Sequence, residues 1–317
     1  MPHHRSVPSA RRSLPRRAAL PAAAAAAVCL TVWTGTGFPS PSGGDSGAVP
    51  WLGALTGQAT DAVAEPASPA DPDEVLTRRL AALPKPAKAS VSVAVIDLKD
   101  GREADYGIGP GKPGAGGTYD TASIVKVDIL AALLLRAQDE HRALTTEEKS
   151  RAAKMIKVSD NESTNALWRA IGTGDGLDAA NKRLGLTGTT AGSGPLWGLT
   201  QSTAADQIAL LSSVFGDGVS SPLTAASRAY IRELMGGIAA DQDWGVSAAG
   251  SVTGLKNGWL SRSATGLWDV NSIGRIEENG HSYLLAVLSR GNVSMKAGIS
   301  LVEKAATTAV SASREWA

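Results

Sequence analysis

Cysteine and histidine are nearly absent from this 317-residue chain, which contains one cysteine and four histidines. The cysteine, Cys29, lies in an apolar N-terminal stretch, so the rest of the chain can form neither a disulfide nor a thiolate metal site. Beyond that stretch only His141 and His281 remain, and neither belongs to an H-E-x-x-H or similar ligand pattern. We therefore expect no metal ion and no cofactor.

Two other patterns are missing. The chain has no G-x-S-x-G turn, which gives little support to a Ser-His-Asp triad. It also lacks a polybasic stripe after residue 17. Of the 31 basic residues, five are arginines in residues 1–17, which leaves 26 basic against 30 acidic residues. This balance argues against nucleic acid as a partner.

The N-terminus has the composition of an export signal. Basic residues 1–17 precede the apolar run from Ala18 to Trp33. We interpret residues 1–33 as an export signal or membrane anchor, with Arg16–Arg17 compatible with twin-arginine export and Cys29 with lipidation. The sequence leaves open whether this segment is cleaved or keeps the protein at the membrane. We expect an extracellular or cell-envelope protein that is monomeric.

Residues 34–73 are rich in Gly, Pro, Ser, Ala and Thr without hydrophobic periodicity, which is typical of a disordered linker. Residues 74–317 are predicted to form one domain. Strands are expected near both of its ends. Val93 and Val95 share one face of the early strand, Leu285 and Val287 share one face of the late strand, and both faces are expected to look onto the same core. The segments between them have helical patterns. This order predicts an α+β fold with an antiparallel sheet built from both chain ends, helices on both of its faces, and an all-helical subdomain.

Three short motifs carry candidate chemistry. Ser123-Ile-Val-Lys126 begins a long helix that is apolar nearly all round. Burial lowers the pKa of a lysine, so Lys126, one turn from Ser123, could act as a base for its hydroxyl. Alternatively, Ser123 only caps the helix and Lys126 extends into solvent.

The second motif, Ser159-Asp-Asn161, separates two predicted helices. The third, Lys256-Asn257-Gly258, lies on a predicted strand. Taken alone, the second motif is better explained by helix capping, and the third by a solvent-facing lysine near a turn. In the functional interpretation, Lys256 places a positive charge beside a backbone that a substrate can approach closely, because Gly258 has no side chain.

In this order, the three motifs resemble the S-x-x-K, S-D-N and K-T-G set of class A β-lactamases and penicillin-binding proteins, over about residues 85–317. The resemblance implies that Ser123 is the acylated nucleophile, Lys126 its general base and Ser159 a proton carrier. It also implies that Asn161, Lys256, Asn257 and Gly258 bind substrate. The backbone N–H groups of Ser123 and Trp259 would form the oxyanion hole. We expect the Ser123, Lys126 and Ser159 side chains to converge, with Lys256 facing them.

The sequence departs from the family pattern in two places. Asn257 replaces the usual threonine or serine. The loop from Gly185 to Thr203 contains no glutamate, whereas class A β-lactamases use one there to activate the deacylating water; the nearest acid, Asp206, follows in the next helix. We therefore expect an exported serine hydrolase that is acylated by β-lactams or related acyl compounds and deacylates slowly. The alternatives are a D,D-peptidase or esterase relative of penicillin-binding proteins, and a non-catalytic ligand-binding or sensor module.

Overall fold

The computed structural model describes residues 70–316, except for residues 85, 110–111, 114–116 and 217–219. The predicted export segment 1–33 and nearly all of the predicted linker 34–73 lie outside the described residues. Among the helices that are described, none is long and apolar enough to cross a membrane.

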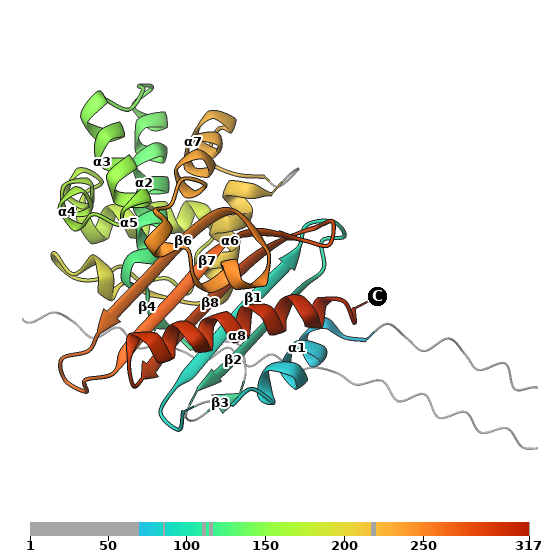
Figure 1. Cartoon of the computed structure of the whole chain (residues 1–317). Coiled ribbons are helices and arrows are strands. Elements are labelled where there is room, and N and C mark those ends of the chain that lie inside the picture. The colour runs from blue at the N-terminus through green and yellow to red at the C-terminus, as the bar shows by residue number, and fades with distance from the viewer. Residues whose placement is uncertain (1–69, 85, 110–111, 114–116, 217–219, 317) are drawn as a thin grey trace, which may run out of the picture. The chain divides into compact units, whose positions relative to one another are not determined.

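Both ends of the described chain contribute strands to one antiparallel sheet (Figure 1). Within the described residues, the sheet has the strand order β3-β2-β1-β8-β7-β6. Its strands are β1 (Ser90–Asp97), β2 (Glu103–Gly109), β3 (Lys112–Pro113), β6 (Ser251–Ser261), β7 (Trp268–Glu278) and β8 (His281–Asn292). Because β1 and β8 are neighbours, segments nearly 200 residues apart in sequence pair directly. The predicted α+β class and the sheet built from both chain ends are confirmed.

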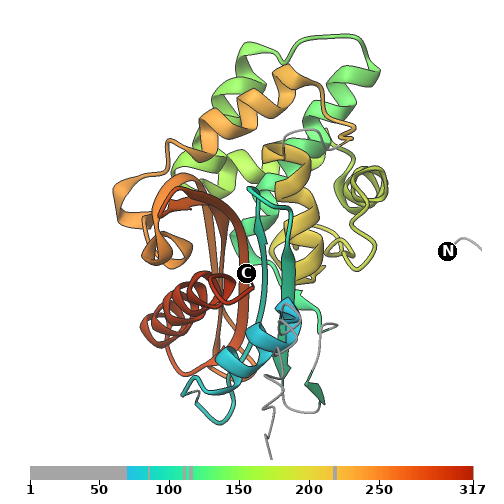
Figure 2. The same ribbon diagram turned by 90° about the vertical axis from the view of Figure 1, so that its right-hand side faces the viewer.

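The register of β1 and β8 explains how the sheet is covered. Val93 pairs with Val287 and Val95 with Leu285, and all four side chains enter one apolar cluster with α1 (Pro72–Ala81) and α8 (Met295–Ser313). Alternate residues of the same strands point the other way, into a second cluster. Figure 2 shows the sheet nearly edge-on, with α1 and α8 on one face. The predicted shared face of the two strands is confirmed.

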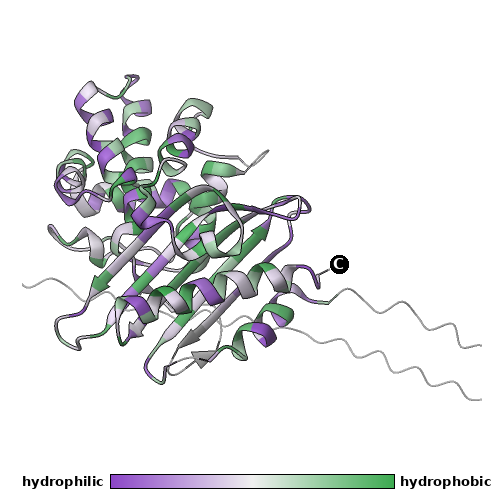
Figure 3. Cartoon of the chain, in the orientation of Figure 1, coloured by the Kyte–Doolittle hydropathy of each residue, from purple (hydrophilic) through white to green (hydrophobic). Residues whose placement is uncertain are grey.

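The second face of the sheet packs against a helical region centred on α2 (Val125–Asp139). Around it lie α3 (Thr146–Lys157), α4 (Asn161–Ala170), α5 (Thr173–Leu184), α6 (Ala204–Phe215) and α7 (Ala225–Met235). Helix α2 is buried on nearly every side, as its composition predicts, and Figure 3 shows hydrophobic colour along this helix and along the central strands of the sheet. The predicted all-helical subdomain is present.

The start of the central helix differs from the prediction. Residues Ala122–Ile124 form a separate 3₁₀ turn, η1, and α2 begins only at Val125. Ala122 has a φ of +49°, a conformation that alanine rarely adopts. No side chain caps either element, so the interpretation of Ser123 as a helix cap is wrong. Ser123 instead lies on the turn that leads into the buried helix.

Candidate active site

The η1 turn that carries Ser123 packs against strand β6. A Cβ atom added to Gly258 would lie 2.7 Å from the backbone nitrogen of Ser123 and 2.8 Å from the carbonyl oxygen of Thr121. Only glycine fits so close to another backbone. The contact brings the backbone that continues to Trp259 beside Ser123, which agrees with the predicted oxyanion hole. The Ser123 side chain is half-buried, and its hydroxyl makes no hydrogen bond within the described part of the chain.

Lys126 is fully buried, and its amine contacts three oxygen atoms. Nζ lies 2.7 Å from Ser159 O, 2.9 Å from Ser159 Oγ and 2.9 Å from Asn161 Oδ1. Burial lowers the pKa of Lys126 to about 7, against an opposing effect of the Asp160 carboxylate. The interpretation of Lys126 as a solvent-exposed side chain is therefore wrong.

Ser159 lies between α3 and α4 and faces both lysines. It adopts a φ of +56°, and the following residue, Asp160, caps α4 by accepting a 2.7 Å hydrogen bond from Ser163 N. Capping thus accounts for Asp160 but not for its neighbours. The hydroxyl of Ser159 and the amide of Asn161 turn instead toward Lys126.

Lys256 approaches the same hydroxyl from β6. Its Nζ atom lies 3.2 Å from Ser159 Oγ and donates to its own strand at Asn257 O, 2.8 Å away. The side chain is fully buried. Burial, reinforced by the charge of Lys126, holds the pKa of Lys256 well below its ordinary value. The predicted convergence is thus confirmed for Lys126, Ser159 and Lys256, while the Ser123 hydroxyl makes no hydrogen bond to this group.

The donors and acceptors around Lys126 indicate how a proton can move. A neutral amine has two N–H groups and one lone pair. Ser159 O and Asn161 Oδ1 can only accept, so the hydroxyl of Ser159 must donate to that lone pair. Lys256 can then donate to Ser159 Oγ. The hydrogen-bond chain Lys256–Ser159–Lys126 is therefore complete when Lys126 is neutral, which is the form that a base requires.

Asn257 does not join this cluster. Its side chain is buried, and Nδ2 donates to Gln242 O at 2.7 Å and to Trp244 O at 2.9 Å. These bonds fasten the segment that contains the short turns η3 (Ala240–Gln242) and η4 (Gly245–Ala249). In a strand, successive side chains point to opposite faces, which separates Asn257 from Lys256 and Gly258. These bonds give Asn257 a structural role, and its expected contact with substrate stays a prediction.

Two residues that the sequence did not single out contact the site. Trp197, in the 3₁₀ turn η2 (Trp197–Leu199), has its ring centroid 4.9 Å from Lys126 Nζ. Asn271 of β7 donates to Asp120 O at 2.9 Å and Thr121 O at 3.0 Å, which fixes the chain just before η1. Neither lies in a recognisable motif. For Trp197, the only signal in the sequence is that an isolated tryptophan lies in the loop from Gly185 to Thr203.

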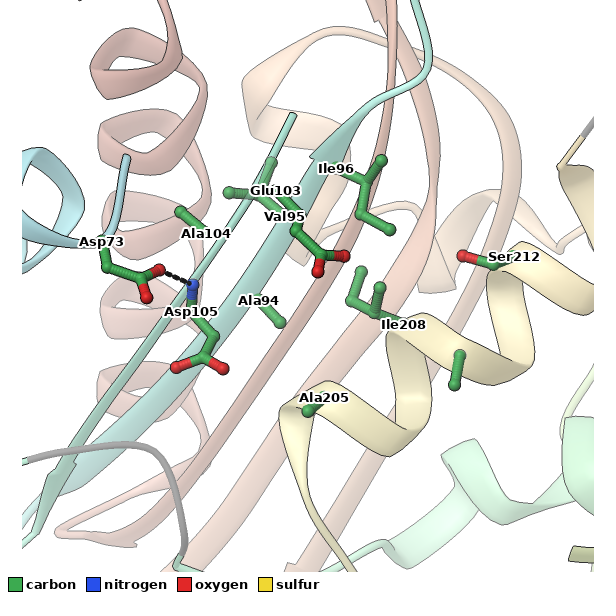
Figure 4. A pocket seen from close by; sticks show the side chains of 11 residues that line it. Asp73, Ala94, Val95, Ile96, Glu103, Ala104, Asp105, Ala205, Ile208 and Ser212 are labelled. Atoms are coloured by element: carbon green, nitrogen blue, oxygen red, sulfur yellow. Dashed lines mark hydrogen bonds between the residues drawn. The ribbon is translucent and has the colours of Figure 1, made fainter. Parts of the chain in front are cut away.

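A separate pocket of about 460 Å³ lies elsewhere, between β1, β2 and α6 (Figure 4). Its floor is apolar, with Ala94 and Ile208, and its rim carries Asp73, Glu103 and Asp105. Burial and the two neighbouring carboxylates raise the pKa of Asp105. None of the residues that line this pocket belongs to the Ser123 site.

The fold and the three motifs together place this chain in the penicillin-recognising serine hydrolase superfamily. A model of the Beta-lactamase enzyme family matches residues 145–312, more than half of the chain, and the chain belongs to that family. No curated protein sequence gives a significant match.

Solved structures agree with this assignment at the level of fold. A class A β-lactamase from Bacteroides cellulosilyticus is 18% identical, with a TM-score of 0.63 over 77% of this chain and 98% of that one. The β-lactamase of Streptosporangium roseum is 17% identical, with a TM-score of 0.59 over 77% and 98%. PBP-A is 17% identical, with a TM-score of 0.58 over 76% and 96%, and a variant of PBP-A was solved as an acyl-enzyme complex with penicillin G.

Proposed function

We propose that this protein is an exported serine hydrolase that is acylated at Ser123 by β-lactams or related acyl compounds and releases the acyl group slowly. The observation that carries the proposal is the hydrogen-bonded chain Lys126–Ser159–Lys256, in which both lysines are buried, together with the close packing of the Ser123 turn against the strand of Lys256. Burying two lysine amines costs free energy unless hydrogen bonds compensate, and here both amines bond to the hydroxyl of Ser159.

In the proposed acylation, the Ser159 hydroxyl turns from the lone pair of neutral Lys126 toward the nitrogen of the substrate. Ser123 Oγ then attacks the carbonyl carbon, and its proton passes to the freed lone pair of Lys126. The backbone N–H groups of Ser123 and Trp259 stabilise the negative charge on the carbonyl oxygen. When the C–N bond breaks, Ser159 gives its proton to the departing nitrogen and regains one from Lys126. The product is an ester of Ser123, with Lys126 neutral again. Lys256 is fully buried, so it favours a substrate carboxylate through its electrostatic field.

We expect slow deacylation because, among the described residues, no free carboxylate is found at the site to act as the base for the attacking water. The loop from Gly185 to Thr203 has no carboxylate. Asp206 lies at the start of α6 and accepts a 2.5 Å hydrogen bond from Thr189 Oγ1, while Asp160 caps α4. Both carboxylates are already engaged by neighbouring groups, so neither is offered as the base for a deacylating water.

Intact-protein mass spectrometry after mixing with a panel of β-lactams tests the proposal. We expect an adduct of one acyl group that decays slowly. A rapidly lost adduct would mean an efficient β-lactamase, and no adduct with any compound would contradict acylation by β-lactams.

A second candidate is a D,D-peptidase or esterase relative of penicillin-binding proteins, which the similarity in fold to PBP-A supports. It predicts a lasting adduct together with cleavage of a D-Ala-D-Ala peptide or a small ester. A lasting adduct without any turnover would favour the third candidate, a sensor module.

Export is a proposal that rests on residues 1–33 alone. Expression of the full chain with a C-terminal tag, followed by separation of medium, membrane and cytoplasm, tests it. Retention in the cytoplasm would contradict it, and recovery from the membrane fraction would indicate an anchor.

A further inference from the structure

Trp197 lies directly against the amine of Lys126. Its ring centroid is 4.9 Å from Nζ, close enough for a cation–π contact. The indole is itself fixed, because Nε1 donates a 2.8 Å hydrogen bond to Asn165 Oδ1 on α4. The ring therefore has a defined position beside the proposed base.

The loop that carries Trp197 is held to its surroundings at several points. Trp168 Nε1 of α4 donates to Gly194 O at 2.9 Å, and Gly192 N donates to Thr200 Oγ1 at 3.1 Å. Next to Trp197, Gly198 packs close to Ala122, since an added Cβ there would lie 3.9 Å from the Ala122 Cα atom. The loop thus contacts the turn that bears Ser123 as well as Lys126.

The surroundings of the Lys126 amine leave it fully buried. Three oxygens of Ser159 and Asn161 surround Nζ, and the indole ring covers it. A water molecule that attacks an ester of Ser123 would need a base, and Lys126, in the first turn of α2 just after the η1 turn that bears Ser123, is the amine nearest in sequence. With the ring in place, such a water cannot reach the amine without displacing one of these groups.

We propose that Trp197 is a positioning residue that keeps water away from Lys126 and thereby prolongs the life of the acyl-enzyme. The effect on the acyl-enzyme rests on the proposed function, whereas the shielding of the amine does not. In the loop where class A β-lactamases carry a water-activating glutamate, this chain thus has an aromatic side chain that excludes water.

Two variants separate the ring over Lys126 from the hydrogen bond that holds it. Trp197→Phe keeps a ring over Lys126 but loses the hydrogen bond to Asn165, and Trp197→Ala removes the ring. Trp268→Ala, which removes a half-buried indole at the start of β7, is the control. Trp197→Leu replaces the alanine variant if that protein does not fold, as judged by circular dichroism.

The first measurement does not depend on acylation. Purified full-length protein is treated with limiting acetic anhydride across a range of pH, and acetylation of Lys126 is quantified by peptide mass spectrometry. The limiting rate at high pH reports access to the amine, and the midpoint reports its pKa. The charged groups that face Lys126 are Lys256 on β6 and Asp160 before α4, and they are unchanged in every variant. We expect Trp197→Ala to raise the limiting rate at least about tenfold and the midpoint as well, because water then solvates the ammonium form.

The second measurement is the lifetime of the β-lactam adduct. We expect it to fall at least about tenfold in Trp197→Ala, equivalent to about 1.4 kcal/mol of barrier, and to change little in Trp197→Phe and Trp268→Ala. Unchanged acetylation in Trp197→Ala overturns the proposal, and so does faster acetylation with an unchanged lifetime. If no variant and no wild-type protein forms an adduct, the proposed function fails, and the acetylation rates alone then decide whether Trp197 shields the amine.

Discussion

Gly258 of strand β6 lies so close to Ser123 that a Cβ atom at position 258 would be 2.7 Å from the Ser123 nitrogen. This contact joins the third motif to the first through backbone atoms alone. It places the strand that carries Lys256 and Trp259 against the turn that carries the proposed nucleophile. The geometry of the site therefore depends on position 258 having no side chain.

Replacing Gly258 with alanine should force these backbones apart. We expect Gly258→Ala to lower the acylation rate by about 10²-fold or more, since small displacements at a reacting centre are costly, and to destabilise the fold by about 1–3 kcal/mol. Stopped-flow acylation and urea unfolding measure the two effects. Gly117→Ala, where the nearest atom would be at an ordinary 3.7 Å, is the control. Normal acylation by Gly258→Ala would contradict the close contact.

Acylation should depend on pH through Lys126. Its pKa is about 7, so the neutral form that can accept a proton predominates only above that pH. We expect the acylation rate to rise through pH 7 and then to level off. Asp160→Asn should shift the midpoint to lower pH, because the Asp160 carboxylate raises this pKa and asparagine still caps a helix. A midpoint that does not move in this variant would argue against Lys126 as the titrating group.

Lys126 should reduce the stability of the protein at neutral pH. Its pKa is about 7 in the folded state and 10.5 ordinarily, so between these values the unfolded state binds more protons. Stability contributed by this group therefore rises with pH from 7 to 10.5 and is lowest below 7. We expect Lys126→Met to be more stable at pH 7 by roughly 1–3 kcal/mol, after the loss of its hydrogen bonds is counted, and inactive in acylation. Urea unfolding at pH 7 and pH 10 checks this, and a larger gain at pH 10 would show that the sign is wrong.

Asn257 should matter for stability more than for substrate. Asn257→Thr introduces the residue that the family pattern favours, but it leaves the carbonyls of Gln242 and Trp244 without their donor. We expect unfolding to become easier by about 1–3 kcal/mol while the acylation rate changes much less. Unchanged stability with a large change in the concentration dependence of acylation would place Asn257 in the substrate site.

The kinetics should show that acylation is faster than deacylation. A general base contributes about 10²–10⁴-fold to a rate, and the loop without a carboxylate deprives only the second step of it. A chromogenic β-lactam should therefore give a burst near one equivalent followed by slow turnover. Ser123→Ala should abolish the burst. Steady, efficient turnover without a burst would mean that another group activates the water.

Much of the architecture could be predicted from local patterns. The alternation of β1 and β8 predicts strands that share one sheet. The apolar spacing within residues 161–170, 204–215 and 225–235 predicts helices, and α4, α6 and α7 have these bounds. The apolar pattern predicts a helix only from Leu177 to Leu184, whereas α5 begins at Thr173, because the glycine-containing segment from Thr173 gives no helical signal. The 3₁₀ turn at Ala122–Ile124 was also missed, since its positive φ is imposed by packing against β6 and by the hydrogen bonds from Asn271.

The amino-acid sequence by itself determined the class of fold, the family and the identity of the motif residues, because hydrophobic periodicity and short motifs are local properties of the chain. Tertiary structure decided what those residues face. The Ser159 hydroxyl is hydrogen-bonded to lysines 33 residues before it and 97 residues after it, and Trp197 covers an amine in a different element. The side chain of Asn257 points to the opposite face of β6 from Lys256, because successive side chains alternate in a strand. There it bonds to the segment that contains Gln242. Such contacts arise only when remote segments pack together, so a motif could name the candidate residues but could not show which of them meet.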